Sequence, residues 1–299
     1  MLEGIFVEGF IYGIMALGVF ITFRILDFPD LTVDGSFPLG AALMATFILQ
    51  GYNLWLALLF AFIGGVGAGC VTALIHNKLK VPHLLAGILT MTMLYSINIR
   101  VLGNRANVPL MRSVTILTQV EKALNGIFSK EISLFLFFLI TVVLIKFLLD
   151  LFFRTDMGLT LGALGNNQQM IISQGINPEY LKIIGVGISN GLVALSGAFA
   201  AQYQGFADVG LGQGIIISGL ASVMIGEFIF RSNKIMILTL NVILGSIIFK
   251  GVMYFGRFYG YYINMTPNDL KLITGLLVIG CLVATNIKKL KKVKKKKDG

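Results

Sequence analysis

The sequence predicts an all-α polytopic membrane protein with about nine transmembrane helices, arranged as two inverted four-helix repeats. Of the 299 residues, 56% are hydrophobic and only 13% are charged, against about 25% charged in ordinary globular chains. The apolar residues form stretches that approach the roughly 20 residues needed to cross a bilayer. This composition excludes extracellular enzymes, nucleic-acid readers and disordered scaffolds.

Nine spans follow from hydropathy interrupted by charged or Pro/Gly clusters. They cover about 5–23, 36–50, 54–75, 83–99, 132–152, 183–202, 215–230, 235–254 and 270–286. We expect one transmembrane domain over 1–286, followed by a basic tail at 287–299. Within the domain, repeat one covers about 5–100, a linking helix about 132–152, and repeat two about 183–286.

The distribution of Lys and Arg predicts the orientation. Eight of the chain's lysines fall within residues 288–297, directly after the last span. Placing this tail in the cytoplasm puts most Lys and Arg residues inside and the N-terminus outside, which requires an odd number of spans. The tail suits contact with anionic lipid headgroups; binding to nucleic acid fits the charge equally, but the tail adjoins a membrane span. The longest external segment, about 100–131, contains an amphipathic run that predicts a short surface helix near 114–128.

Two Asp- and Gly-rich breaks, at about 27–36 and 205–214, each separate two spans and give weak evidence of the inverted repeat. Interrupted helices at matching positions of an inverted repeat are typical of transporters and mark the substrate path. Non-helical backbone at membrane depth must be buried in protein or line a wet cavity. The first break also fits an ordinary cytoplasmic turn with solvated acids. The residues that we expect along the translocation path are Asp30, Thr32, Asp34, Gly35, Asp208, Gly212 and Gly214.

The cytoplasmic segment 153–182 predicts a short helix. Asn166 or Asn167 can cap it, Met170–Ile172 gives it an apolar side, and Gly175 is placed to end it shortly before Pro178. A free helix of two or three turns is marginal in water. We therefore expect this helix to dock on its own bundle or on another protein.

The same segment carries Arg154-Thr-x-Met-Gly, then Ala163-Leu-Gly-Asn-Asn, then Gly175-Ile-Asn-Pro. These motifs resemble the coupling loop of permeases in the branched-chain amino acid ABC importer family, a loop that inserts into a cleft of the cytoplasmic ATPase. The resemblance extends over about 10–286. It implies ATPase coupling through Arg154, Gly158, Ala163, Gly165, Asn166, Gly175, Ile176 and Asn177.

Two further segments extend the resemblance, and one of them also departs from the branched-chain permeases. The run 206–227 is similar to a Gly-rich span of the family, and Asp30-Leu-Thr-Val-Asp-Gly-Ser is similar to an element of ribose-type permeases, with Asp34 as an extra residue. Branched-chain permeases proper carry an Asn-Phe-Ala-His-Gly type sequence where this chain has Leu31-Thr-Val-Asp-Gly. In this respect the chain resembles the subgroup linked to tryptophan or tyrosine uptake, which leaves the substrate open.

The resemblance therefore implies the permease subunit of a bacterial ABC importer for amino acids or similar small solutes, working by alternating access in the cell membrane. No Gly-x-x-x-x-Gly-Lys-Ser/Thr motif occurs, so we expect ATP on partner subunits, and neither a cofactor, a metal nor catalysis on this chain. The resemblance implies a second permease copy, identical or not, a cytoplasmic ATPase dimer and an extracytoplasmic solute-binding lipoprotein. The alternatives are an ion-coupled secondary transporter and a channel with inverted repeats.

Overall fold

The computed structural model describes residues 2–111, 113–124, 129–229, 232, 234–260, 272–280 and 283. Almost all of its regular structure is helical. The elements, in chain order, are α1 (Leu2–Phe20), the π-helical turn η1 (Ile21–Ile25), α2 (Val33–Leu49), α3 (Leu54–Leu79), α4 (His83–Val101), β1 (Asn107–Pro109), α5 (Ile116–Leu124), α6 (Lys130–Phe152), α7 (Asp156–Asn166), α8 (Gln168–Ser173), α9 (Pro178–Gln204), β2 (Phe206–Asp208), the 3-10 turn η2 (Val209–Gly212), α10 (Ile215–Ile229) and α11 (Ile235–Gly260).

Seven helices in the described part of the chain are long and apolar enough to cross a membrane, and α2 is a shorter apolar helix. An all-helical, polytopic membrane protein is confirmed at this level. The number nine stays a prediction, because the last expected span, 270–286, lies largely outside the described residues. Of that span, residues 272–280 are helical. The expected repeats also stay a prediction.

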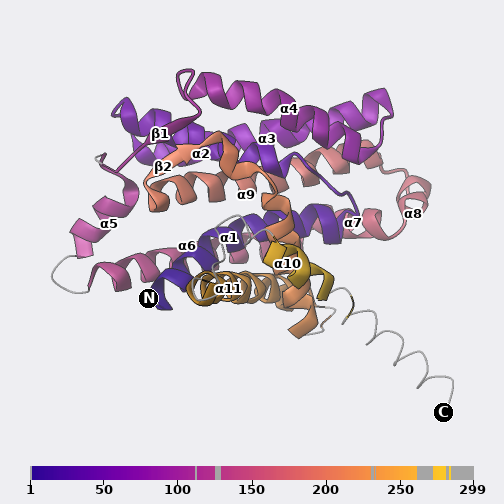
Figure 1. Ribbon diagram of the computed structural model, residues 1–299. Coiled ribbons are helices and arrows are strands. Elements are labelled where there is room, and N and C mark those ends of the chain that lie inside the picture. The colour runs from indigo at the N-terminus through magenta and orange to yellow at the C-terminus, as the bar shows by residue number, and fades with distance from the viewer. Residues whose placement is uncertain are drawn as a thin grey trace, which may run out of the picture.

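The helix α9 lies at the centre of the bundle and packs against α1, α2 and α3. Figure 1 shows it between a layer formed by α2, α3 and α4 and a layer that contains α1, α6 and α11. Small residues allow this close packing, as is usual in membranes. A Cβ atom on Gly40 of α2 would overlap the carbonyl oxygen of Ala194, and one on Gly65 of α3 would overlap that of Asn190. The core therefore depends on direct contact between helix backbones.

One end of the bundle, which we call the sheet end, carries β1, β2 and α5 (left in Figure 1). The strands β1 and β2 pair antiparallel, with Val108 opposite Ala207, and the backbone N–H of Ile116 in α5 donates to the side chain of Gln202 in α9 at 2.9 Å. The helix α5 lies within the run where the sequence predicts a surface helix; residues 125–128 of that run lie outside the described residues. This short pairing of two three-residue strands, which the sequence analysis did not predict, is an addition to a bundle that is otherwise helical.

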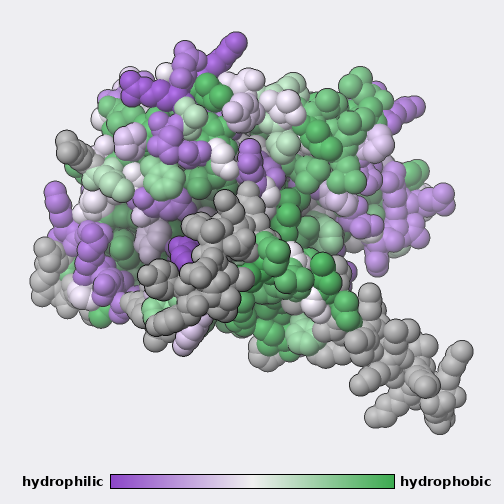
Figure 2. All heavy atoms as spheres, in the orientation of Figure 1, coloured by the Kyte–Doolittle hydropathy of each residue, from purple (hydrophilic) through white to green (hydrophobic). Residues whose placement is uncertain are grey.

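The opposite end, which we call the loop end, carries α7 and α8 (right in Figure 1). Figure 2 shows hydrophilic residues gathered toward the two ends and hydrophobic residues dominant between them. Large apolar side chains exposed along the helices include Leu59 of α3, Ile140 of α6 and Phe147 of α6. A helical bundle with an apolar waist and polar ends is the arrangement expected of a protein whose solvent is the bilayer.

Candidate functional site

The starts of α2 and α10 meet inside the bundle. The carboxylate of Asp34, in the first turn of α2, accepts hydrogen bonds from the backbone N–H of Gly214 at 2.8 Å and of Ile216 at 3.0 Å. One of these N–H groups directly precedes α10 and the other is in its first turn, where the helix cannot supply its own acceptors. Gly212 approaches so closely that a Cβ atom there would overlap the carbonyl oxygen of Asp34. Three of the predicted path residues, Asp34, Gly212 and Gly214, therefore lie together.

The first break is anchored at the middle of α9 by the side chain of Asn190. This amide donates to Asp30 Oδ2 at 2.6 Å and accepts from the hydroxyl of Ser36 at 2.7 Å. At about 1.5 Å per residue, Asn190 lies about 18 Å from Pro178 and about 21 Å from Gln204. The chain therefore folds back from the loop end, where η1 ends, to half the length of α9 before α2 begins.

The other predicted path residues lie apart from the Asp34–Gly214 contact. Thr32 is fully buried and its hydroxyl is 2.7 Å from that of Thr72 in α3. Gly35 packs against α4, where a Cβ atom would come within 2.9 Å of Leu94 Cδ1. Asp208 caps η2 through the N–H of Gly210 at 2.6 Å, at the sheet end. Their roles in a path stay predictions.

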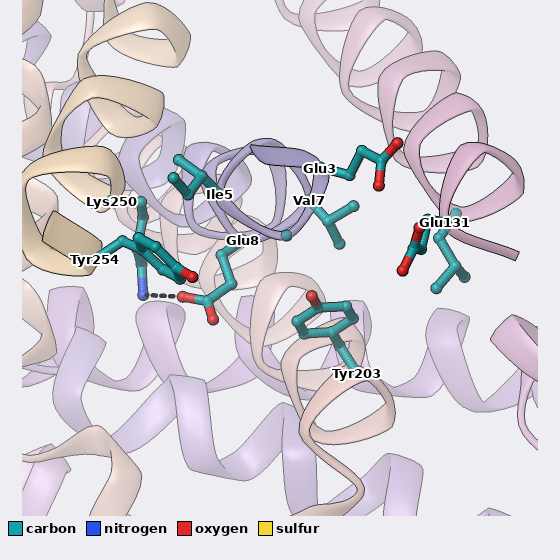
Figure 3. A pocket seen from close by; sticks show the side chains of 10 residues that line it. Glu3, Ile5, Val7, Glu8, Glu131, Tyr203, Lys250 and Tyr254 are labelled. Atoms are coloured by element: carbon teal, nitrogen blue, oxygen red, sulfur yellow. Dashed lines mark hydrogen bonds and ion pairs between the residues drawn. The ribbon is translucent and has the colours of Figure 1, made fainter. Parts of the chain in front are cut away.

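Two cavities adjoin this region. The larger, of about 440 Å³, lies between α1, α10, α11 and the second break, and its lining includes Tyr12, Gln213 and Gly214. The smaller, of about 300 Å³, lies toward the sheet end, and Figure 3 shows Glu3 and Glu131 on one side of it and Glu8 and Tyr254 on the other. Glu8 and Lys250 line both cavities, and Lys250 Nζ lies 3.2 Å from Glu8 Oε2.

The sequence analysis placed none of Glu8, Tyr12, Lys250 and Asn190 in the site. A signal for two of them exists, because Glu8 and Lys250 are ionisable residues within apolar helices, and such residues mark functional positions or pair with each other. Their pairing is a property of the packing of α1 against α11 and has no local sequence signature.

The loop end is built largely as the sequence predicts. Asn167 caps α8, its side chain accepting the N–H of Met170 at 3.2 Å. Gly175, at a φ of 77°, ends the turn after α8, and Pro178 begins α9 with Asn177 as its cap. Ile171 is buried, whereas Met170 and Ile172 are about half exposed. The helix α8 therefore rests on the bundle by one side chain and leaves two apolar ones uncovered.

The predicted coupling residues divide into an exposed and an inward-facing group. Exposed side chains or backbone are found at Arg154, Asn166, Gly175, Ile176 and Asn177.

Gly158 and Gly165 face inward and Ala163 is half-buried. A Cβ atom on Gly158 would overlap the carbonyl oxygen of Phe152, and one on Gly165 would overlap that of Ile25 in η1. These two glycines thus let α7 lie directly on the end of α6 and on η1. The sequence analysis did not predict α7 as a separate helix.

Among the described residues, no group of three or more His, Cys, Asp and Glu side chains is arranged to hold a metal ion. The expectation that the chain holds neither a metal nor a cofactor stays a prediction.

Comparison with known proteins decides the family. A family model described as branched-chain amino acid transport system / permease component matches residues 1–282. This chain belongs to that family. It is an integral membrane protein of the permease class.

Two relatives are similar over most of their length. A tyrosine transport system permease protein of Clostridioides difficile is 42% identical over 280 residues, which are 94% of this chain and 90% of the relative. An uncharacterized protein of Rickettsia prowazekii is 34% identical over 266 residues, 88% of this chain and 90% of the relative.

More distant relatives cover less. The autoinducer 2 import system permease protein of Salmonella typhimurium is 26% identical over 205 residues, 66% of this chain and 54% of the relative. No solved structure matches the chain significantly.

Proposed function

We propose that this chain is the membrane-spanning subunit of an ATP-driven ABC importer that carries an amino acid, with an aromatic amino acid as the first candidate. The observation that carries the proposal is that this chain matches both a family model and a named relative. The family description names branched-chain amino acid transport. The relative that is 42% identical over 94% of the chain is named a tyrosine transport system permease protein. The departure at Leu31-Thr-Val-Asp-Gly from branched-chain permeases proper supports the aromatic alternative.

We further propose two inverted repeats in which the shorter helices α2 and α10 begin in the interior. The Asp34–Gly214 contact supports this arrangement, because both helices start there and α2 runs toward the sheet end while α10 runs toward the loop end: Thr46 of α2 bonds to Val101 at the end of α4, and Glu227 of α10 pairs with Arg24. Helix N-termini at the bilayer midplane are suited to bind polar substrate groups. Alternating access would rock one repeat against the other about this contact.

In this proposal α8 and its flanks bind a cytoplasmic ATPase, which holds the ATP that this chain has no motif to bind. Met170, Ile172 and Ile176 expose apolar side chains on α8 and the turn that follows it. An amphipathic helix that fills a hydrophobic cleft is a common mode of recognition. ATP-driven closure of two ATPases would then move α7 together with η1, because Gly165 of α7 lies on the backbone of η1.

The proposed orientation places the loop end and the basic tail in the cytoplasm, near anionic lipid headgroups, and the sheet end outside the bacterial cell membrane. The sheet end, with α5, would receive a solute-binding lipoprotein, and a second permease copy would complete the membrane unit. The chain would bind no nucleic acid.

A pull-down tests the ATPase contact. The tagged full chain is purified in a gentle detergent from its native membrane, as wild type and as I172K and V114K. The side chains of Ile172 and Val114 are 52% and 56% exposed at opposite ends of the bundle, so the two substitutions are matched. We expect wild type and V114K to bring down a P-loop ATPase in defined ratio and I172K to lose it.

Two results would count against the proposal. One is a chain that purifies alone under conditions that keep other ABC complexes intact, which would favour the self-sufficient transporter or the channel. The other is equal recovery of the ATPase with I172K and with wild type.

A further inference from the structure

The ion pair between Glu8 of α1 and Lys250 of α11 stands between the two cavities. Glu8, Lys250 and Tyr254 line both of them (Figure 3). The smaller cavity extends from the pair toward the sheet end, along Glu3 and Tyr203, and the larger extends from it to the second break at Gly214. A solute in either cavity therefore lies beside both charges.

The pair is only partly satisfied by the protein. Lys250 Nζ reaches Glu8 Oε2 at 3.2 Å and lies 3.2 Å from the centroid of the Tyr12 ring. The other carboxylate oxygen of Glu8 has no hydrogen-bond donor among the described residues, and the Glu8 side chain is 41% exposed against 15% for Lys250. The hydroxyl of Tyr12 is held in turn by Gln204 Nε2 at 3.3 Å. The cation is therefore fixed in place, and the anion keeps capacity for another donor.

A second ion pair shows what a purely structural pair looks like in this bundle. Lys146 and Asp150 of α6 bond to each other, and Asp150 also accepts from the hydroxyl of Thr239 at 2.8 Å. Asp150 is 5% exposed and lines neither cavity. Both of its oxygens are occupied by protein donors, which is the condition under which buried charges are tolerated. The Glu8–Lys250 pair differs in its access to both cavities.

We propose that the larger cavity binds an α-amino acid as the zwitterion, with the ligand's ammonium group on Glu8, its carboxylate on Lys250, and its side chain against Tyr12 and the second break. The proposal rests on the proposed function, and it names the residues that would hold the cargo. A zwitterion brings one charge of each sign, so it can separate Glu8 from Lys250 and still give each of them a partner. An unpaired charge would be costly in a membrane protein. A cavity of about 440 Å³ lies within the range of small-molecule sites, about 300–1,000 Å³.

The same arrangement predicts selection by charge. An amine without a carboxylate can bind Glu8 but leaves Lys250 without an anion, and a carboxylic acid without an amine leaves Glu8 without a cation. Contacts to charged groups are strong enough that losing one should weaken binding at least about tenfold. The site should therefore prefer the zwitterion over both of its singly charged analogues.

Cysteine protection in native membranes tests this site on the full chain. Ser218 lines the larger cavity, and S218C is introduced after Cys70 and Cys281 are replaced by Ala. The rate of reaction with a small membrane-permeant maleimide is measured with L-tyrosine, with tyramine and with 3-(4-hydroxyphenyl)propionate. A parallel set with leucine, 3-methylbutylamine and 4-methylpentanoate covers a branched side chain.

In the S218C background, we expect the amino acid of at least one set to slow the reaction at concentrations at least about tenfold below those needed for either analogue. K250M should reduce this preference and favour the amine, and E8Q should favour the carboxylic acid. The control K146M, which breaks the pair that lines neither cavity, should keep the preference for the amino acid. Opposite changes of preference in E8Q and K250M cannot arise from general misfolding, because misfolding would weaken the binding of all three ligands alike.

Three results would overturn the site. The first is that no amino acid protects the introduced cysteine in a chain that still supports amino-acid uptake. The second is stronger protection by the amine than by the amino acid in the S218C background, and the third is an unchanged ligand preference in both E8Q and K250M. The first leaves the proposed importer standing and removes only its site. Conversely, the labelling experiment could show the expected preferences while deletion of the chain leaves amino-acid uptake intact. That combination would support the site and refute the importer.

Discussion

Asp34 Oδ2 accepts the backbone N–H of Gly214, a residue 180 positions further along the chain, at 2.8 Å. The contact joins the start of α2 to the start of α10. A carboxylate is well placed there, because the first turn of a helix carries unpaired N–H groups and a partial positive charge. We regard this contact as the point about which the two halves of the protein are organised.

Replacing Asp34 by Ala should therefore impair both stability and transport. Two N–H groups lose their acceptor, which costs about 1–3 kcal/mol when such groups are left unsatisfied away from water. D34N keeps an amide oxygen for one of them and should lie between D34A and wild type. Thermal unfolding of the detergent-purified protein and uptake in cells measure the two effects. The control is D156N, at an exposed position of α7; equal stability of D34A and D156N would show that the contact is dispensable.

Gly165 should tolerate no side chain, whereas Gly162 on the same helix should. A Cβ atom on Gly165 would overlap the carbonyl oxygen of Ile25, while nothing lies within 4 Å of a Cβ atom on Gly162. G165A should displace α7 from η1 at a cost of about 1–3 kcal/mol, as overpacking does, and G165W should abolish uptake. G162A should be neutral or slightly stabilising, because Ala favours helix over Gly by about 1 kcal/mol.

The readouts for this pair are uptake and recovery of monodisperse protein. A G165W chain that transports normally would contradict both the packing of α7 and its role in coupling.

Asn190 should be the most sensitive polar residue of α9. Its amide holds Asp30, which is 1% exposed, at 2.6 Å. N190A leaves that carboxyl group without one of its donors, and leaving a buried polar group unsatisfied costs about 1–3 kcal/mol. N166A, at an exposed position of the loop end, should change the free energy of unfolding by no more than about 0.5 kcal/mol. A melting temperature of N190A close to that of N166A would show that the Asn190–Asp30 hydrogen bond does not stabilise the fold.

The ion pair between Arg24 and Glu227 should affect transport more than stability. It joins η1 to α10 at the loop end with an N–O distance of 2.5 Å, and the side chains are 55% and 34% exposed. Pairs this exposed contribute about 0–1 kcal/mol. R24E and E227R should each reduce uptake with little change in unfolding temperature, and the double exchange should restore part of it. If the double variant is as impaired as the singles, the pair has no role as a contact between the two elements.

The apolar helices could be predicted from the sequence because span length and hydropathy are local properties. Helices α3, α4 and α6 begin within two residues of the expected spans. The short helix α8 was predictable for the same reason, since Asn167 and Gly175 act on their immediate neighbours. The seven candidate spans, with α2 as a shorter helix, agree with the prediction as far as the described residues extend.

Long-range contacts could not be predicted in the same way. The pairing of Val108 with Ala207 joins two segments of three residues that carry no strand pattern. No helix was predicted over the segment from Gly158 to Gly165, because α7 depends on packing against η1. The Glu8–Lys250 contact requires knowing that α1 lies against α11. Each of these features is set by tertiary packing, which no single segment encodes.

Uptake of radiolabelled L-tyrosine, alongside L-tryptophan and L-leucine, tests the central claim most directly. Cells of the organism that encodes the chain are compared as wild type, as a deletion of this chain, and after complementation with wild type and I172K. We expect the deletion to abolish uptake of at least one of these amino acids, and we expect wild type to restore it while I172K does not. Uptake of all three amino acids that is the same with and without the chain would contradict the proposed function.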